Sequence, residues 1–477
     1  MLRRTKIVAT MGPATDDLEV LTEMMRAGLD VVRLNASHGT VVDRRRYLAQ
    51  VGEAARRADR CIGVLLDLGG PKIRIEGFRT GRVQLTEGQS FTLDTALDPK
   101  AGTNATVGVA YQDLPRDVTA GDTLLLADGQ IVLDVERVGA TTVETRVRVG
   151  GELSDRKGLN RQGGGISAPA ISARDLEDIQ FAAAEGVDYL AVSFAREAGD
   201  IEQARKLLRA AGGDARIVAK IERHEAVDNL PGIIDASDVV MVARGDLGVE
   251  MGYAELTGLQ KTIIHETRAR NRVVITATQM MESMIQNPVP TRAEVSDVAN
   301  AVMDGTDAVM LSAETATGRY PVKAVQAMAQ VIEGAEKYQL THPSSRQRVL
   351  EGLFKGTEEA IARAVMYTAN HMKVRAIVAL TESGATPLWM SRIRSDIPVY
   401  AFTRHQTTRR RVTLYRGVYP VIFDVTGAVT VDELYRALFA RLLELQLVKK
   451  RDLVILTKGE LSGVQGGTNS MVILKVV

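Results

Sequence analysis

The sequence predicts an α/β protein, built as a (β/α)8 barrel with an inserted all-β lid domain and a C-terminal open α/β domain. Three observations predict this fold class. Eight short apolar runs, rich in β-branched residues, alternate with stretches of helical length. About a hundred residues after the third run alternate polar and apolar side chains instead. A second series of strand and helix signals follows residue 346.

The eight runs have the composition of parallel strands that are buried on both faces. They are Lys6–Ala9, Asp30–Leu34, Ile62–Leu66, Val187–Val192, Arg216–Ile221, Asp238–Ala243, Arg272–Ala277 and Asp307–Leu311. Amphipathic stretches between them, such as Asp16–Ala27 and Val41–Ala58, fit the crossover helices of an α/β fold. Eight repeats favour a closed barrel over residues 1–70 and 167–340. An open doubly wound sheet is the alternative.

The all-β insert is expected over residues 71–166. In Thr142–Val149 the period of two places four side chains on one side, namely Val143, Thr145, Val147 and Val149. Asp128 and Gly129 lie between two apolar runs, which is a strong hairpin signal. Because the insert follows the third strand of the barrel, it would act as a lid over the active face.

The C-terminal domain is expected over residues 346–477, after a linker at 341–345. Its strand signals are Arg375–Leu380, Ile397–Phe402, Val418–Phe423, Asp452–Leu456 and Met471–Val476. Helical stretches lie between these runs, so a small open α/β sheet is expected.

Composition excludes several classes of protein. The chain has 477 residues, of which 45% are hydrophobic and 25% are charged, as in ordinary globular proteins. Its 60 basic and 59 acidic residues give a net charge of +1, which argues against nucleic-acid binding. No apolar run is long enough for a membrane span or a signal peptide. With Cys61 as the single cysteine, a cytoplasmic location is expected.

Charged or hydroxyl side chains follow seven of the eight strand runs. They are Arg33, Asn35, Ser37 and His38 at the end of the second, Asp67 after the third, Ser193 after the fourth, Lys220 and Glu222 at the end of the fifth, Arg244 and Asp246 after the sixth, Thr278 after the seventh, and Ser312 and Glu314 after the eighth. Catalytic groups of (β/α)8 enzymes lie at these carboxyl ends of the strands. The pattern therefore predicts an enzyme.

Two of these carboxylates suggest a metal site. Lys220 and Glu222 are two residues apart on a strand and so project to the same side, and Arg244 and Asp246 would do likewise. Glu222 and Asp246 could share one divalent cation, and two carboxylates with several waters suit Mg²⁺ or Mn²⁺. The alternative is that both carboxylates only form ion pairs, with Lys220 and Arg244. No cluster of His and Cys suggests zinc.

Basic side chains at the same strand ends suggest a phosphorylated, anionic substrate. Arg33, Lys72, Arg74 and Lys220 together with a metal would form an electrostatic clamp of the kind that phosphoryl transfer requires. The run Gly163–Gly165 is interpreted as a hinge or tight loop of the lid and not as a nucleotide fingerprint, because no strand immediately precedes it.

Seven strings, in order along nearly the whole chain, resemble the motifs of the pyruvate kinase family. They are Lys6–Ala14, Arg33–Gly39, Asp67–Arg74, Ala219–Glu222, Met241–Gly248, Ala277–Met284 and Met310–Thr315. The resemblance implies the glycolytic reaction of phosphoenolpyruvate with ADP to give pyruvate and ATP. It also implies a homotetramer, with small molecules as partners and with no nucleic acid or membrane.

The resemblance further implies a role for each matching residue. Glu222 and Asp246 would hold Mg²⁺ (or Mn²⁺), and Lys220 would stabilise the phosphoryl group in transfer. The implied substrate contacts are Arg33, Ser193, Gly245, Asp246 and Thr278, the implied nucleotide contacts are Asn35, Ala36, Ser37, His38, Arg74 and Lys157, and the implied proton-delivery set is Thr278, Ser312 and Glu314. For Thr278 and Ser312, helix capping is the alternative.

Among the departures from the family pattern, one is at Lys72 and one is at the end of the insert. Members that require K⁺ carry Glu where Lys72 stands, so the ammonium of Lys72 would replace the cation and activity without K⁺ is expected. The residues that the resemblance implies as K⁺ ligands are nevertheless present, namely Asn35, Ser37 and Asp67. Residues 157–165 form a longer connection than in many members, at the return of the lid.

A loop in the C-terminal domain resembles the family's site for a phosphorylated effector. It comprises Thr381, Ser383, Gly384, Ala385 and Thr386, after a strand and at the start of a helix. An ordinary helix cap is the alternative. Two other functions for the whole chain stay open from the residues alone: a Mg²⁺-dependent lyase or aldolase that works through an enolate, and a non-catalytic sensor of metabolites.

Overall fold

The computed structural model describes the whole chain except residues 1, 343–353, 355, 425–429 and 460–466. Residues 343–345 of the predicted linker therefore lie outside the described residues. The chain divides into two compact units. The first, here called unit 1, comprises Met1–Leu66, Val187–Tyr189 and Thr267–Val477, and the second, unit 2, comprises Asp67–Gly186 and Leu190–Glu266.

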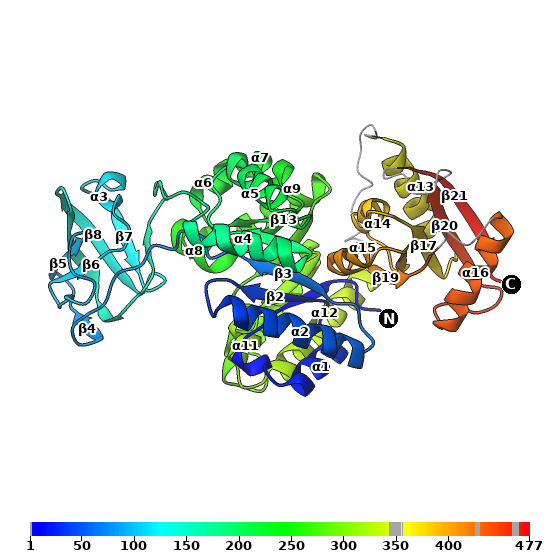
Figure 1. Cartoon of the computed structure of the whole chain (residues 1–477), viewed down its shortest axis with the longest axis horizontal. Coiled ribbons are helices and arrows are strands. Elements are labelled where there is room, and N and C mark those ends of the chain that lie inside the picture. Colours follow the sequence, from blue (N-terminus) through cyan, green and yellow to red (C-terminus); the bar gives the residue numbers. More distant parts are fainter. Residues whose placement is uncertain (1, 343–353, 355, 425–429, 460–466) are drawn as a thin grey trace. The chain divides into compact units, whose positions relative to one another are not determined.

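Eight strands form a closed barrel, in the order β1-β16-β15-β14-β13-β12-β3-β2. Of these strands, β2, β3 and β13 are labelled in Figure 1. The barrel strands are β1 Lys6–Thr10, β2 Val31–Asn35, β3 Gly63–Asp67, β12 Tyr189–Val192, β13 Arg216–Ile221, β14 Val239–Ala243, β15 Val273–Ala277 and β16 Ala308–Leu311. β1 pairs in parallel with both β2 and β16, which closes the ring. The closed barrel is thus confirmed over the open sheet.

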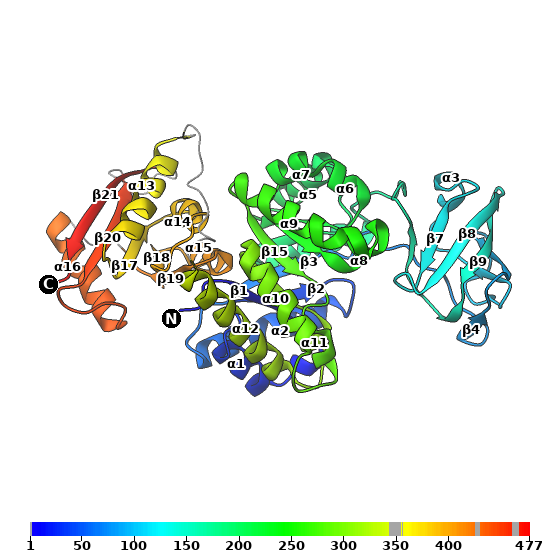
Figure 2. The same cartoon turned by 180° about the vertical axis from the view of Figure 1, so that it is seen from behind.

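Helices connect the barrel strands. They are α1 Leu18–Arg26, α2 Val41–Arg57, α4 Ala173–Glu185, α5 Ala198–Ala210, α6 His224–Asp228, α7 Leu230–Ala236, α8 Arg244–Met251, α9 Tyr253–Ala269, α10 Arg292–Asp304, α11 Ala313–Ala316 and α12 Pro321–Thr341, with the 3-10 turns η1 Pro13–Thr15 and η2 Glu282–Ile285. Capping boxes begin several of them, at Thr40, Ser172 and Thr291. α10 packs beside α12 on the outside of the barrel (Figure 2).

The insert after β3 forms its own core in unit 2, with strands that are antiparallel except for the parallel pair β5 and β6. Its main sheet has the order β11-β7-β8-β9-β5-β6, and β10 pairs with β4. The elements are β4 Arg82–Leu85, β5 Ser90–Asp94, β6 Thr106–Gly108, α3 Leu114–Asp117, β7 Thr123–Leu126, β8 Ile131–Val138, β9 Thr142–Val149, β10 Gly151–Ser154 and β11 Leu159–Arg161. The hairpin predicted at Asp128 and Gly129 joins β7 to β8, and both residues have positive φ.

The predicted alternation of buried and exposed side chains along β9 is confirmed at three of the four positions that were expected to be buried. Val143, Thr145 and Val147 are buried, but Val149 is 47% exposed. The ladder between β8 and β9 shifts register between Val132 and Leu133, so Val149 lies beyond a bulge. A bulge bends the strand and re-aims the side chain that follows it, which a strict period of two does not predict.

The C-terminal domain in unit 1 is a five-stranded sheet of order β19-β18-β17-β20-β21. Its elements are α13 Thr357–His371, β17 Ala376–Leu380, α14 Ala385–Ser391, β18 Val399–Thr403, α15 Gln406–Arg411, the 3-10 turn η4 Val412–Leu414, β19 Val418–Ile422, α16 Val431–Glu444, β20 Leu453–Gly459 and β21 Thr468–Lys475. The first three pairings are parallel and β21 is antiparallel. The five predicted strands are therefore present.

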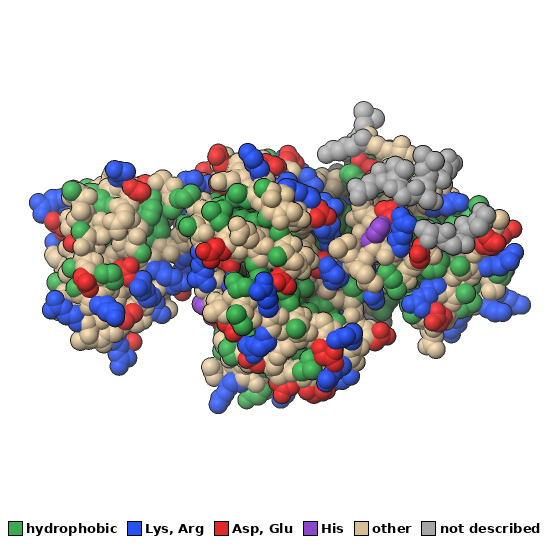
Figure 3. All heavy atoms as spheres, viewed as in Figure 1, with side chains coloured by type: hydrophobic (Ala, Val, Ile, Leu, Met, Phe, Trp, Pro, Cys, Tyr) green, Lys and Arg blue, Asp and Glu red, His purple; other side chains and the backbone are tan. Residues whose placement is uncertain are grey.

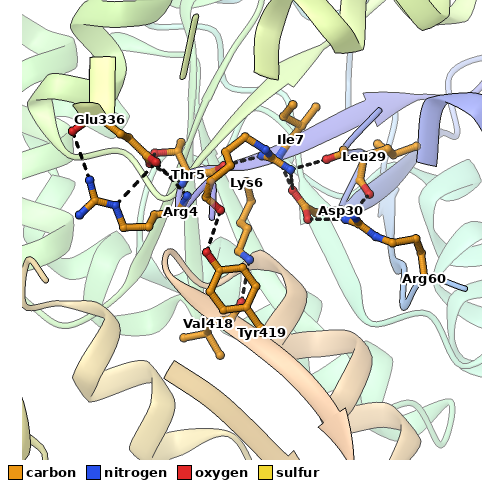
Figure 4. A network of polar contacts seen from close by, with 12 residues as sticks. Arg4, Thr5, Lys6, Ile7, Leu29, Asp30, Arg60, Glu336, Val418 and Tyr419 are labelled. Carbon is orange, nitrogen blue, oxygen red and sulfur yellow. Dashed lines mark hydrogen bonds and ion pairs between the residues drawn. The ribbon is translucent and has the colours of Figure 1, made fainter. Parts of the chain in front are cut away.

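The start of β1 and the C-terminal sheet share a buried polar network in unit 1 (Figure 4). The carboxylate of Glu336 accepts the backbone N–H groups of Arg4 and Thr5 at 2.9 and 2.7 Å. The ammonium of Lys6 donates to the carbonyl of Val418 at 2.6 Å and lies 4.5 Å from the ring centroid of Tyr419. Charged groups thus replace apolar packing at this junction, and each has a partner, as burial demands.

Side chains of both charge signs are exposed on the molecule. Figure 3 shows acidic and basic side chains interspersed over the face in view, as the near-neutral composition leads one to expect. None of the helices in the part of the chain that the structure describes is both long enough and apolar enough to cross a membrane.

The buried ammonium of Lys6 makes stability depend on pH. Burial lowers the pKa of Lys6 from its usual 10.5 to about 8, although Asp30 opposes the shift. The unfolded state therefore binds more protons than the folded state between these values, and stability rises with pH over that window. We expect the free energy of unfolding of the wild type to gain about 1–2 kcal/mol over that of Lys6→Met between pH 7 and pH 9.5. Urea unfolding at both pH values measures this, and a constant difference would contradict it.

Candidate active site

The ammonium of Lys220 is the centre of a polar cluster in unit 2. It lies 2.8 Å from Glu222 Oε1 and 3.3 Å from Asp67 Oδ1, and it donates to Ser193 Oγ at 2.8 Å. The side chain of Lys220 is only 12% exposed. Lys220 at the end of β13 and Glu222 just after it therefore project to the same side, as their spacing predicts. They meet Asp67 at the end of β3 and Ser193, which directly follows β12.

Glu222 is an almost completely buried carboxylate, 1% exposed. Its Oε2 accepts the backbone N–H of Phe194 at 2.8 Å. Burial raises its pKa, the negative charge of Asp246 raises it further, and Lys220 opposes both. Two carboxylates close enough to repel each other favour a cation between them, because the cation lowers the cost of burying both charges.

The structure places Asp246 differently from the sequence prediction. Arg244 and Asp246 lie in α8, which begins directly after β14, so they do not share a side as residues of a strand would. Asp246 lies 3.6 Å from the ammonium of Lys72, and Arg244 donates to Gln260 Oε1 at 3.3 Å. The Glu222–Lys220 ion pair that the sequence suggested is present, whereas the ammonium that pairs with Asp246 is that of Lys72.

The donor set fits a hard cation. Among the described residues, no three His, Cys, Asp or Glu side chains are grouped closely enough to hold a metal ion by themselves. Glu222 and Asp246 would supply two carboxylates, with water and substrate oxygens as the remaining ligands. That is the way in which proteins commonly bind Mg²⁺ at phosphate-handling sites.

Two predicted nucleotide-binding residues lie at the base of the lid. Arg74 forms a β-bridge with Gly158, and its guanidinium donates to the carbonyl of Arg156 at 2.9 Å. The carbonyl of Lys157 accepts the N–H of Ile75 at 3.0 Å. Arg74 and Lys157 therefore come from two chain segments that run side by side, one entering the lid domain and one leaving it.

The segment after β2 in unit 1 is a tight turn. Asn35 Oδ1 accepts the N–H of Ser37 at 3.0 Å, and the carbonyl of Asn35 accepts the N–H of His38 at 3.3 Å. Arg33 donates to Thr10 Oγ1 at 3.0 Å. Ala36 lies within the turn and is buried. The turn brings the predicted residues Asn35 to His38 together, after the carboxyl end of β2.

Backbone strain marks the end of β15 in unit 1, and a buried carboxylate marks the end of β16. Thr278 and Gln279 follow β15 with φ of 66° and 52°, in the left-handed region that non-glycine residues seldom adopt. Glu314 accepts the N–H groups of Ser312 and Met281 at 2.7 and 3.1 Å, and burial raises its pKa. Strain and buried carboxylates that are held by specific contacts gather at functional sites.

Helix capping does not account for Thr278 or Ser312. Thr278 Oγ1 donates to the carbonyl of Ala277 at 2.6 Å, and the next helical turn, η2, begins only after Met281. Ser312 is the N-cap residue of α11, but its side chain makes no capping hydrogen bond. The capping alternative is therefore wrong for both hydroxyls.

The predicted effector loop follows β17 and includes the first two residues of α14. Thr381 Oγ1 accepts the N–H of Gly384 at 2.9 Å, and Ser383 Oγ accepts that of Ala385 at 3.4 Å. Thr386 is buried, and its hydroxyl contacts that of Thr468 at 2.7 Å. The loop closes on itself by local contacts, while Thr386 is committed to packing against β21.

Two parts of the site have no counterpart in the sequence prediction. The Lys72–Asp246 contact joins residues far apart in the chain, and no local pattern predicts it. Phe194 holds Glu222 through its backbone N–H while its own φ is 57°. No sequence signal indicates this conformation, because a bulky aromatic residue is among the least expected there.

Comparison with known proteins agrees with this architecture. Residues 2–325 match the family model described as pyruvate kinase, barrel domain, and residues 359–474 match the one described as pyruvate kinase, alpha/beta domain. The chain is 52% identical to pyruvate kinase II of Salmonella typhimurium, covering 100% of this chain and 99% of the relative. It is 50% identical to pyruvate kinase of Haemophilus influenzae, covering 99% and 98%.

A solved structure agrees as well. A pyruvate kinase from Cryptosporidium parvum superposes with a TM-score of 0.91 at 32% identity, covering 100% of this chain and 96% of that one. The barrel, the mostly β insert and the C-terminal α/β sheet thus define an enzyme of the barrel class with two accessory domains. The chain belongs to the pyruvate kinase family.

Proposed function

We propose that the cluster around Lys220 carries out the reaction of this enzyme, in which phosphoenolpyruvate and ADP give pyruvate and ATP. The observation that carries the proposal is the ammonium of Lys220, 12% exposed and held by Ser193, Glu222 and Asp67. A fixed, nearly buried ammonium offsets the negative charge of a phosphoryl group in transfer better than a mobile, solvated one.

Glu222 and Asp246 hold Mg²⁺ or Mn²⁺ in this proposal. A bound divalent cation neutralises charge on the substrate's carboxylate and phosphoryl oxygens. The remaining substrate contacts come from Arg33, Ser193, Gly245 and Thr278. Asn35, Ala36, Ser37, His38, Arg74 and Lys157 bind the nucleotide, and the last two of these belong to the base of the lid.

The second half of the reaction needs a proton at carbon. Once the phosphoryl group has left, the enolate of pyruvate is protonated, and we assign delivery of the proton to Thr278, Ser312 and Glu314. The raised pKa of Glu314 supports this role, because a carboxyl group that is protonated more readily can act as an acid nearer to neutral pH.

Replacement of Lys220 tests the assignment. We expect Lys220→Met to lower kcat by about 10³-fold, since the phosphoryl group loses its main charge partner among the side chains. A coupled assay for pyruvate measures it. Lys206→Met is the matched control, because Lys206 is a lysine on α5, outside the cluster. Undiminished turnover of Lys220→Met would refute the assignment.

The same assay without ADP distinguishes a kinase, which needs ADP to release pyruvate, from a lyase that works through an enolate. Pyruvate released at an equal rate without ADP would favour the lyase, and no pyruvate under either condition would favour a sensor. Dependence of the product on ADP supports the transferase.

We also propose that the enzyme works without K⁺. The ammonium of Lys72 lies 3.6 Å from Asp246 and so already supplies a monovalent positive charge beside the metal-binding carboxylate. Asn35, Ser37 and Asp67 are the residues that K⁺ would use if it binds. Full activity in a buffer of tetramethylammonium salts is expected for the wild type.

Replacement of Lys72 by Glu tests this idea. We expect Lys72→Glu to lose at least about tenfold in kcat/KM in K⁺-free buffer, because two carboxylates would then face each other without a cation. Added KCl should restore most of the loss. An absolute K⁺ requirement of the wild type would contradict the proposal.

For partners, we propose a homotetramer in the cytoplasm that is activated by a phosphorylated metabolite. In this proposal the loop of Thr381, Ser383, Gly384, Ala385 and Thr386 binds the phosphate by exchanging its local contacts for bonds to the ligand, and Thr386 takes part only if it gives up its contact with Thr468. We expect Ser383→Asp to abolish activation by sugar phosphates and nucleoside monophosphates while basal turnover is kept, because a carboxylate repels the phosphate. Initial rates at subsaturating phosphoenolpyruvate measure this, and unchanged activation would exclude the loop.

A further inference from the structure

The chain enters the lid through a connection, residues 68–72, that is packed against the barrel. The N–H of Leu68 donates to the carbonyl of Ala191 at 3.0 Å, and that of Gly70 donates to Asp175 Oδ1 at 3.2 Å. Gly70 has φ of 62°, and a Cβ there would lie 2.9 Å from the ring of Phe194. The entering connection is therefore in contact with Phe194 and tolerates no side chain at Gly70.

The chain leaves the lid through a second connection, residues 162–167, that is bonded at three points. Gly163 donates to the carbonyl of Glu250 at 3.4 Å, Gly165 donates to Glu225 Oε1 at 2.6 Å, and the carbonyl of Ile166 accepts a bond from Arg223 at 2.9 Å. All of its partners lie in unit 2, on or beside the segments that follow β13 and β14.

Arg223 and Phe194 join the two connections. The guanidinium carbon of Arg223 lies 5.3 Å from the ring centroid of Phe194, and the two residues are 4% and 6% exposed. Phe194 thus contacts the entering connection at Gly70, and Arg223 donates a hydrogen bond to the leaving connection at Ile166. A stacked guanidinium is planar and its donors are fixed in direction, which makes the contact sensitive to geometry.

Phe194 also contacts Glu222. Its N–H donates to Glu222 Oε2 at 2.8 Å, and its φ of 57° is the conformation that aims the N–H in that direction while the ring packs on Gly70. A bulky aromatic residue in the left-handed region is strained and persists only where its surroundings hold it. The strain is therefore maintained by the contacts that tie Phe194 to the lid connections and to Glu222.

We propose that Phe194 and Arg223 are positioning residues that couple the two connections of the lid to the orientation of Glu222. A displacement of either connection is transmitted to the ring of Phe194, and from its backbone N–H to the carboxylate. The coupling itself rests on contacts within unit 2. Only its consequence for metal binding rests on the function proposed above for Glu222.

Hydrogen exchange of the ligand-free enzyme tests the coupling. We expect Arg223→Met to raise exchange at least about fivefold at both connections, although Arg223 bonds only the leaving one. We expect Phe194→Leu, which alters the contact with the entering connection, to raise exchange at both connections as well. Arg223→Lys, which keeps a cation and one donor, should be intermediate. Exchange raised at residues 162–167 alone, with residues 68–72 unchanged, would overturn the proposal.

A pair of glycine substitutions gives a matched control that leaves both positioning residues in place. Gly163 and Gly164 have φ of 80° and 78°, so alanine is equally strained at either. A Cβ at Gly163 meets nothing within 4 Å, whereas one at Gly164 would lie 2.7 Å from Glu225 Oε2. We expect Gly164→Ala to raise exchange at residues 68–72 and Gly163→Ala to leave it unchanged. Equal effects of the two would count against the coupling.

Mn²⁺ titration by electron paramagnetic resonance tests the consequence at the metal. We expect Arg223→Met to weaken Mn²⁺ binding about tenfold, in the range found when residues that orient a ligand are lost. Glu222→Gln is the reference. If Glu222→Gln weakens binding and Arg223→Met does not, the link from the lid to the metal is refuted. If neither substitution weakens Mn²⁺ binding, the metal role of Glu222 is refuted. The hydrogen-exchange experiment then still decides whether the lid connections and Glu222 are coupled.

Discussion

The site depends on one electrostatic constraint, which is that Lys220 and Glu222 are buried side by side. The carboxylate of Glu222 is 1% exposed, and burial raises its pKa. The ammonium 2.8 Å away and the N–H of Phe194 keep the charged form accessible. Removal of either partner leaves an uncompensated buried charge. Lys220, Glu222, Ser193 and Phe194 therefore depend on one another, and a change in one of them affects the contacts of the others.

The strands could be predicted from the sequence because their cause is local. A parallel strand that is buried on both faces must be apolar along its length, so runs such as Arg216–Ile221 are visible without any knowledge of the neighbours. The chemistry at the strand ends was visible for a related reason, since the carboxyl end of a barrel strand is where polar groups can reach a shared site. The spacing argument is right for Lys220 and Glu222 on β13, but it is wrong for Arg244 and Asp246, because the chain turns at once into α8.

What the sequence could not predict depends on contacts between distant segments. Lys72 meets Asp246 only because the chain entering the lid passes the end of β14, and Val149 is exposed because of a bulge in the partner ladder. The left-handed conformation of Phe194 contradicts its own propensity, so local rules give the wrong answer there. Such conflicts between local preference and native structure are expected at functional sites, where tertiary contacts offset the strain.

Strain and buried charge occur together in both units, and this has a common physical cause. Phe194 in unit 2 and Thr278 in unit 1 each follow a barrel strand within two residues, and both have positive φ. The N–H of Phe194 donates to the buried carboxylate of Glu222. Three residues after Thr278, the N–H of Met281 donates to the buried carboxylate of Glu314. A carboxylate that has lost its water needs N–H groups aimed at it from fixed directions. A regular strand end directs its N–H groups along the ladder, so the chain must leave regular geometry to supply such donors. The cost in backbone energy therefore follows from the burial of acids at the mouth of a barrel, and we expect it wherever this arrangement is used.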